Sequence, residues 1–187
     1  MSEFKFPTEV IDLPSKGLIY LESSPLSSGT IELKYMSAKE EDILTNTNFI
    51  EKGIVIDKLL QSMIVGKVDY DELIAGDKNA ILFAARILGY GANYDIELTD
   101  KYGKRVKTIV DLSKLQNKQF DEKLFVKGKN EFNFNLPQSK VTVTFKLLTH
   151  GDEKKIDEEI KGLKKINKDS SPELSTRLKY MITLQFN

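Results

Sequence analysis

The chain has 187 residues, its 28 basic side chains balance its 28 acidic ones, and 40% of its residues are hydrophobic. This length allows one large domain or two small ones, and the charge balance offers no general affinity for a nucleic-acid backbone. Cysteine is absent, which excludes disulfides and thiolate metal sites. No apolar run approaches the roughly 20 residues of a membrane-spanning helix, and no signal peptide is recognisable. We therefore expect a soluble protein made in a cytoplasm.

Residues 1–28 are apolar at intervals that fit no helix, and Pro7 and Pro14 each remove a backbone donor. We interpret this segment as an extended N-terminal arm. Such an arm either lies across a neighbouring subunit or closes a core from outside, and the sequence does not choose between these.

The segment 29–44 (GTIELKYMSAKEEDIL) predicts a strand that leads directly into a helix. Apolar and polar residues alternate from Ile31 to Tyr35, as in a half-buried strand. Ser37 stands three residues before Glu40, the spacing of a capping box in which each residue satisfies the other's backbone N–H. Glu41 adds negative charge at the positive end of the helix dipole.

The middle of the chain predicts further helices and a hairpin. After a break near residue 46, residues 54–65 have a helical apolar pattern. Residues 78–88 are dense in apolar side chains and predict a central helix, with Asp77 as its N-cap. Residues 94–98 and 105–110 then alternate on either side of a turn, which indicates a β-hairpin.

The last third predicts a second group of elements after a polar linker at 113–130. Residues 132–134 and 141–145 alternate and should pair as a hairpin. A charged helix follows over about 152–165, and another helix begins at Pro172 and ends near residue 181.

The strand and helix start at 141–156 (VTVTFKLLTHGDEKKI) repeat the pattern of 29–44. Thr149 takes the place of the cap Ser37 at a distance of 112 positions. Asp152 and Glu153 then fall on the two glutamates of the first copy.

A second correspondence follows each copy. Residues 178–182 (LKYMI) resemble residues 60–64 (LQSMI) at a distance of 118 positions. A six-residue insertion between the two helices of the second copy would reconcile the two distances. We interpret the pattern as an internal duplication, although two ordinary strand–cap–helix units could coincide by chance.

These patterns predict an α+β fold of short antiparallel hairpins with helices, built from two related strand–capped helix–helix units. The expected domains are an arm at 1–28, a first unit at 29–112 with the central helix and hairpin, a linker at 113–130, and a second unit at 131–187. The second unit lacks the continuation of the first, so the natural chain could extend beyond residue 187.

Catalytic chemistry finds little support. The only histidine, His150, lies beside a predicted helix cap. The acidic clusters at 40–42 and 157–159 fall on helices among lysines, where ion-paired, solvated faces are the simpler interpretation. A hydrolase would need two carboxylates, such as Glu41 and Glu153, to meet in one pocket. We expect no catalytic residue, no cofactor and no metal site.

The remaining candidates are surfaces that could bind a protein partner. Five aromatic residues are candidate exposed anchors for a protein partner, and core or loop packing is the alternative for each: Phe4, Phe6, Tyr20, Phe49 and Tyr102.

Basic residues at Lys101–Lys107 surround Tyr102 on the predicted hairpin. They could stack on and bind single-stranded nucleic acid, but a solvated hairpin tip is the simpler interpretation.

Four segments stand out in order along the chain: PSKG at 14–17, GTIELKYMSAKEEDIL at 29–44, AARILGYGANYDIEL at 84–98 and FKLLTHGDE at 145–153. In this combination they resemble the baseplate protein family of T-even-type contractile-tailed bacteriophages. YMSAKEEDIL and LLTHGDE are also distantly similar to the helix starts of phage tail-assembly chaperones.

The resemblance implies a non-catalytic structural or assembly component of the baseplate hub that docks other proteins. Its partners would be other baseplate and tail proteins in a hetero-oligomeric assembly, which could hold several copies, with neither nucleic acid nor membrane involved. It would lie in the virion tail baseplate after assembly in the host cytoplasm. The alternative is a transient assembly chaperone that is absent from the mature virion.

Overall fold

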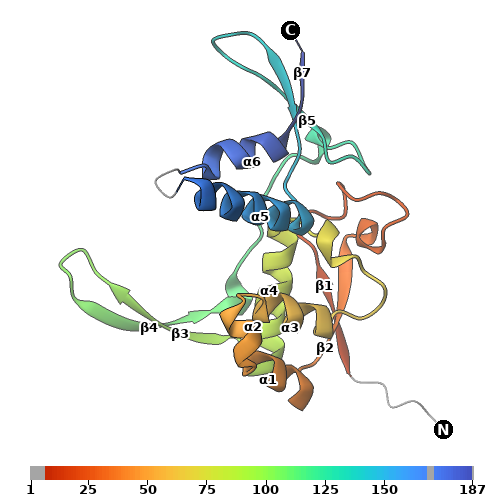
Figure 1. The fold of residues 1–187 in the computed structure, drawn as a ribbon. Helices are drawn as coiled ribbons and strands as arrows, with labels where there is room; N and C mark the ends of the chain where they lie inside the picture. Colours follow the sequence, from red (N-terminus) through yellow and green to blue (C-terminus); the bar gives the residue numbers. More distant parts are fainter. Residues whose placement is uncertain (1–6, 168–170, 187) are drawn as a thin grey trace. The chain divides into compact units, whose positions relative to one another are not determined.

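The computed structural model describes residues 7–167 and 171–186, which form six α-helices and seven strands in short antiparallel sheets (Figure 1). The predicted α+β class is confirmed. The chain divides into two compact units. Unit 1 holds the described residues as far as Pro14, with Thr30–Gly66 and Asn79–Gln119, and unit 2 holds Ser15–Gly29, Lys67–Lys78 and the described residues from Phe120 onward. The contiguous domains suggested by the sequence stay a prediction.

Unit 1 begins with a two-stranded antiparallel sheet. β1 (Thr8–Asp12) pairs with β2 (Thr30–Lys34), with Ile11 opposite Ile31. Ile31 and Leu33 are buried while Glu32 is exposed, as the alternation predicts. The described part of the predicted arm supplies β1, whose side chains are mostly exposed, and farther along it Leu13 and Leu26 are buried.

Helices follow β2 in unit 1: α1 (Ala38–Leu44), α2 (Thr47–Glu51), α3 (Val55–Met63) and all but the first turn of α4 (Ala75–Tyr90). The sequence showed only a break where α2 lies. Five residues are too few for a periodic pattern, and α2 is set by its N-cap, Asn46, whose side-chain oxygen accepts from the Phe49 N–H at 3.1 Å.

The helix start predicted at Lys78 is wrong, because α4 already begins at Ala75. Asp77 lies within the first turn and is completely buried. Its carboxylate accepts hydrogen bonds from the Ser15 N–H at 2.9 Å, the Ser15 hydroxyl at 2.6 Å and the Tyr20 hydroxyl at 2.5 Å. Asp77 therefore anchors the 15–20 turn of unit 2 instead of capping its own helix.

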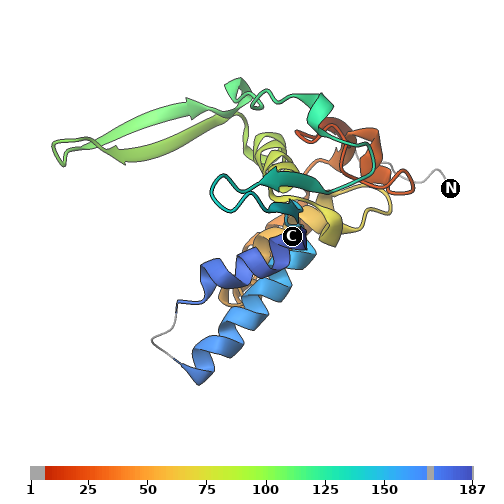
Figure 2. The same ribbon diagram turned by 90° about the horizontal axis from the view of Figure 1, so that it is seen from above.

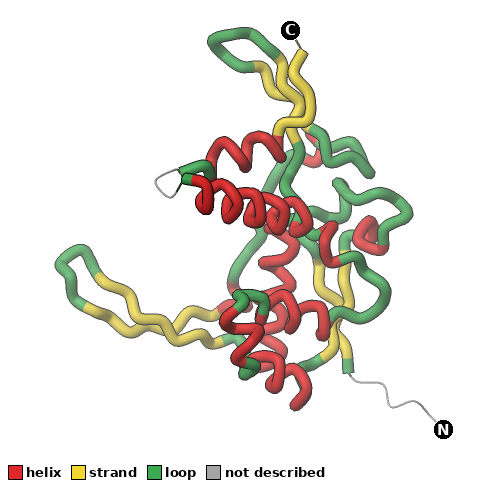
Figure 3. Tube along the Cα trace, in the orientation of Figure 1, coloured by secondary structure: helices red, strands yellow, loops and turns green. Residues whose placement is uncertain are grey.

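Unit 2 contains a three-stranded antiparallel sheet in the order β5-β6-β7 and a pair of helices (Figure 3). Its elements are η1 (Pro25–Ser28), η2 (Tyr70–Glu72), η4 (Glu122–Leu124), β5 (Phe132–Asn135), β6 (Thr142–Phe145), α5 (His150–Ile166), α6 (Glu173–Met181) and β7 (Ile182–Phe186). The predicted hairpin and both predicted late helices are present.

The two units repeat one local structure at the two distances found in the sequence. In unit 1, Leu33 of β2 forms a bridge with Ile64, just after α3. In unit 2, Phe145 of β6 pairs with Ile182, just after α6. Phe145 lies 112 positions after Leu33, and Ile182 lies 118 after Ile64. In both copies the chain leaves a strand, forms a capped helix (α1 or α5) and a returning helix (α3 or α6), and pairs again with the same strand; in unit 1 the short α2 lies between the two helices.

Both first helices begin with the predicted capping box. Thr149 Oγ1 accepts from the Asp152 N–H at 3.2 Å, and the Asp152 carboxylate accepts from the Thr149 N–H at 3.1 Å. Lys146 on the preceding segment lies 2.7 Å from the same carboxylate. Burial tends to raise the pKa of Asp152, but the hydrogen bonds from Lys146 and Thr149 outweigh it and lower the pKa.

In the first copy the longer Glu40 side chain makes one further connection. It is completely buried and accepts from Ser37 N–H at 3.0 Å, Lys34 Nζ at 2.8 Å and the Ser62 hydroxyl of α3 at 2.6 Å. Burial tends to raise the pKa of Glu40, but these hydrogen bonds outweigh it and lower the pKa to about 2. One carboxylate thus joins β2, α1 and α3.

We predict that Glu40→Gln lowers the free energy of unfolding at pH 7 by about 2–4 kcal/mol, because it leaves Lys34 without its buried partner. Urea unfolding followed by circular dichroism measures the change. Glu51→Gln, at an exposed position of α2, is the matched control and should stay within about 0.5 kcal/mol of wild type. Equal effects of the two substitutions would contradict the assigned role of Glu40.

The stability of the wild-type protein should fall as the pH drops from about 4.5 towards 2. The folded pKa of Glu40 lies below its ordinary value of 4.5, so its contribution is complete above that value and is lost as the carboxylate is protonated in the folded state. The difference between wild type and Glu40→Gln should therefore shrink across this range in a pH series of urea unfolding curves. A constant difference from pH 6 to pH 2 would show that Glu40 does not carry this stability.

Candidate functional site

A long β-hairpin in unit 1 is the first candidate surface. β3 (Asn93–Thr99) and β4 (Arg105–Asp111) pair along their full length, which confirms the predicted hairpin. In Figures 1 and 2 it extends away from the helices of unit 1. A two-stranded hairpin has little core of its own and is only marginally stable without packing on one face.

One face of this hairpin is apolar. Tyr94 opposes Val110 and Leu98 opposes Val106, and the alternation of strands puts both pairs on one side. Leu98 is 54% exposed, and Tyr94 and Val106 are exposed to a similar degree. A row of exposed apolar side chains on a projecting ribbon marks a surface suited to another protein.

The hairpin tip holds Tyr102 out in solvent. Asp100 Oδ1 accepts from the N–H groups of Tyr102 at 2.8 Å and Lys104 at 2.9 Å, and Gly103 supplies the positive φ of 80° that the turn requires. Tyr102 is 82% exposed, and the Lys101 ammonium lies 5.1 Å from its ring centroid. The turn therefore presents an aromatic side chain from a well-defined backbone.

The charges of the hairpin cancel. Four basic and four acidic residues lie between Asn93 and Asp111, and Arg105 approaches Glu97 to 3.7 Å. A phosphate backbone would favour a net positive surface. The composition of the hairpin suits a protein partner better than a nucleic acid.

The base of the hairpin contacts α4, which is in turn joined to α1. The Arg86 guanidinium lies 5.0 Å from the ring of Tyr90 and 5.5 Å from that of Tyr94. The Tyr90 hydroxyl donates to Glu41 at 2.8 Å, and this hydrogen bond is the main cause of the raised pKa of Tyr90. This cluster was not predicted, although the four-residue spacing of Arg86, Tyr90 and Tyr94 was a signal for part of it.

The five aromatic candidates differ in how far the structure exposes them. Phe4 and Phe6 lie outside the described residues, and Phe49 is half-buried. Only Tyr102 among the other candidates is clearly exposed. The expectation that Tyr20 is exposed is corrected, because its ring is buried in unit 2 and burial, with the nearby Asp77 carboxylate, raises the pKa of its hydroxyl.

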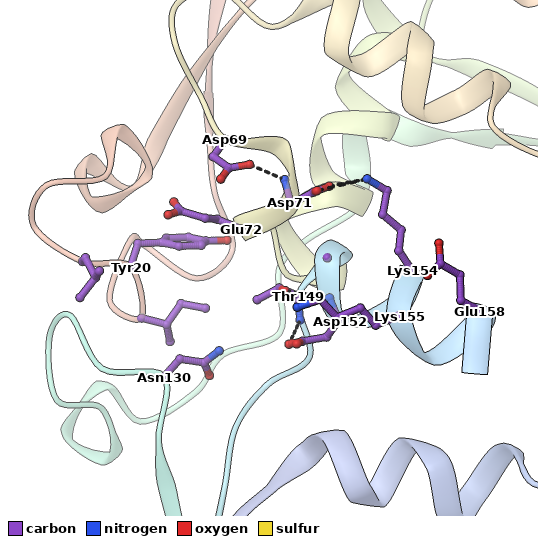
Figure 4. Close-up of a pocket in the computed structure, with 13 residues that line it drawn as sticks. Tyr20, Asp69, Asp71, Glu72, Asn130, Thr149, Asp152, Lys154, Lys155 and Glu158 are labelled. Atoms are coloured by element: carbon purple, nitrogen blue, oxygen red, sulfur yellow. Dashed lines mark hydrogen bonds and ion pairs between the residues drawn. The ribbon is translucent and has the colours of Figure 1, made fainter. Parts of the chain in front are cut away.

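A hollow of about 530 Å³ in unit 2 is the second candidate (Figure 4). It is formed by the 19–21 turn, the 69–72 segment and the first turns of α5. Five acidic residues line it: Asp69, Asp71, Glu72, Asp152 and Glu158.

Most of these carboxylates are held by neighbours within unit 2. Asp71 pairs with Lys154 at 2.8 Å, and Asp69 accepts from the Asp71 N–H at 3.0 Å, as Figure 4 shows. Glu72 accepts from the Ser24 hydroxyl at 2.6 Å. General acid catalysis needs a carboxyl group with a raised pKa, whereas that of Asp152 is lowered. The carboxylates of the hollow therefore hold the surrounding loops and α5 together.

The other groups considered for chemistry are also engaged in packing. His150 is buried, with its ring 4.8 Å from that of Tyr70 and its Nδ1 3.3 Å from Lys78 Nζ. Glu153 pairs with Arg177 at 2.6 Å and so links α5 to α6.

Neither a metal-binding cluster nor a membrane-spanning helix occurs in the described part of the chain, residues 7–167 and 171–186. No group of three or more His, Cys, Asp or Glu side chains there could hold a metal ion. None of the helices in those ranges is long and apolar enough to cross a membrane.

Comparison with known proteins identifies the family. The family model described as "T4 bacteriophage base plate protein" matches residues 10–180. The chain belongs to this family. It is therefore a phage tail component with a structural role in the baseplate, where it interacts with other tail proteins. No curated protein and no solved structure matches the chain.

We predict that Tyr20→Phe lowers the free energy of unfolding by about 1.5–3 kcal/mol, because it removes a hydrogen bond to the buried Asp77 carboxylate. Chemical unfolding at pH 7 measures the loss. Tyr102→Phe makes the same change at an exposed position and should leave stability unaltered. If both variants unfold like wild type, Tyr20 does not anchor unit 2 through its hydroxyl.

Proposed function

We propose that the protein is a non-catalytic component of the baseplate hub of a contractile tail and that it acts by docking other proteins, with the β3–β4 hairpin as a main docking element. The observation that carries this proposal is the exposed apolar face of the hairpin. Tyr94, Leu98 and Val106 are exposed there, and Tyr102 projects from the tip. Aromatic and apolar anchors of this kind supply most of the binding energy in protein interfaces.

The way in which the hairpin is mounted supports docking. The Arg86 guanidinium of α4 lies against the ring of Tyr94 in β3 and so fixes the base of the hairpin to α4, and the hydrogen bond from Tyr90 to Glu41 joins α4 to α1. A pre-organised binding element loses less conformational entropy when it docks, so more of its contact energy appears as affinity.

A second function, binding of nucleic acid by Lys101–Lys107, has less support. The basic residues there face an equal number of acidic ones on the same hairpin. A gel shift that weakens with salt and disappears in a Lys104→Glu, Arg105→Glu double variant would favour it.

Leu98→Glu and Tyr102→Ala test the docking role. Each should reduce incorporation of the chain into baseplate assembly intermediates at least tenfold, because each removes an exposed apolar contact, while the free energy of unfolding stays within about 0.5 kcal/mol. Sedimentation of extracts from infected cells, with the chain quantified in each fraction, gives the readout.

The matched control for this experiment is Leu124→Glu, an exposed apolar position in unit 2 that is 70% accessible. Incorporation of the control should equal that of wild type. Normal incorporation of both hairpin variants would refute the docking role of the hairpin.

Mass spectrometry of purified virions separates a hub component from a transient chaperone. We expect the chain in mature particles at a fixed ratio to the other baseplate proteins. Its presence in assembly intermediates but absence from virions would instead establish the chaperone alternative.

A further inference from the structure

Unit 2 has an open apolar groove of about 410 Å³. Phe145, Leu147 and Leu148, at and after the end of β6, form one wall. Met181 of α6 and Gly76 in the first turn of α4 also line it. A Cβ atom added at Gly76 would meet nothing within 4 Å, so there is open space beside this residue.

The corresponding residues of unit 1 are covered. At the distances that relate the two copies, Leu178 and Met181 correspond to Leu60 and Met63. Leu60 and Met63 are both 0% exposed, whereas Leu178 is 41% exposed. The position of Leu60 is therefore core in the first copy and surface, as Leu178, in the second, while Met181 is half-buried where Met63 is buried.

Helix α4 contributes to the covered core of unit 1. Its residues Ile81 and Ala85 are buried there, and Gly89 continues the same face at a four-residue interval. A Cβ atom added at Gly89 would lie 2.3 Å from Sδ of Met36, so the Met36 side chain packs closely against α4 at this glycine. Met36 corresponds to Leu148, which lines the groove of unit 2.

Unit 2 has no counterpart of this part of α4 among the residues that the structure describes. After α6 the chain passes directly into β7, which pairs with β6. Leu174 of α6 is 71% exposed, and it shares with Leu178 and Met181 an arc of the helix that adjoins the groove. The charges at the rim are already paired, because Arg177 contacts Glu153 and Lys146 contacts Asp152.

We propose that this groove receives an α-helix from another baseplate protein, as Met36 of unit 1, the counterpart of Leu148, packs against α4. The inference rests on the proposed docking function and names the chemistry of one partner. The entering helix should carry a large apolar residue, an alanine and a glycine at successive four-residue intervals, like Ile81, Ala85 and Gly89. A second copy of this chain does not supply that helix, because its own Ile81 and Ala85 are buried.

Site-specific photo-crosslinking tests the proposal. A photoreactive phenylalanine analogue replaces Leu174 or Leu178 in the full chain, and baseplate assembly intermediates are purified and irradiated. The matched control carries the analogue at Ile166, an exposed apolar position of α5 that does not belong to the face of α6 shared by Leu174, Leu178 and the groove residue Met181. Crosslinks from 174 and 178 should exceed those from 166 at least tenfold and map to a helix of another protein with the stated spacing.

Crosslinks to a second copy of this chain, to a non-helical segment, or at the level of the Ile166 control would each overturn the inference. If the chain enters intermediates through its hairpin and these positions still give no specific crosslink, the groove proposal fails while the docking function stands. If the chain enters no intermediate, both fail together.

Discussion

A buried carboxylate at the start of a helix fixes how each unit is built. In unit 1, Glu40 is held by Lys34 of the preceding strand, by its own helix cap and by Ser62 of the second helix. Such a charge is tolerable in a core only when every partner is in place, so it forces the strand and both helices into one arrangement. In unit 2, Asp152 pairs with Lys146, which follows β6, and accepts from the N–H of the cap residue Thr149. The neighbouring Glu153 pairs with Arg177 of α6.

The same local unit ends in two different ways, and this difference bears on function. In unit 1, α4 adds buried residues to the core and leads into a rigidly mounted hairpin with an apolar face. In unit 2 Leu178 remains exposed beside a groove that Leu148 and Met181 line. One repeated local structure therefore presents two distinct apolar surfaces, which are the surfaces that the proposed docking role would use.

Local signals made much of this structure predictable. The Ser37–Glu40 and Thr149–Asp152 spacings predicted both capping boxes. The distances of 112 and 118 positions between the two copies match the two places where the chain returns to pair with its strand. Long-range polar contacts could not be predicted in the same way. Nothing near Asp77 in sequence indicates that its partners lie some sixty positions earlier, so its burial and that of Tyr20 were missed.

Hydrogen exchange of the free chain and of the chain within baseplate assembly intermediates tests most directly whether partners cover the hairpin and the groove. Amides of β3, β4 and α6 should exchange more slowly in the assembly, because partners cover them there, while those of α1 and α3 should change little. Equal exchange of β3, β4 and α6 in both states would show that partners do not cover these surfaces.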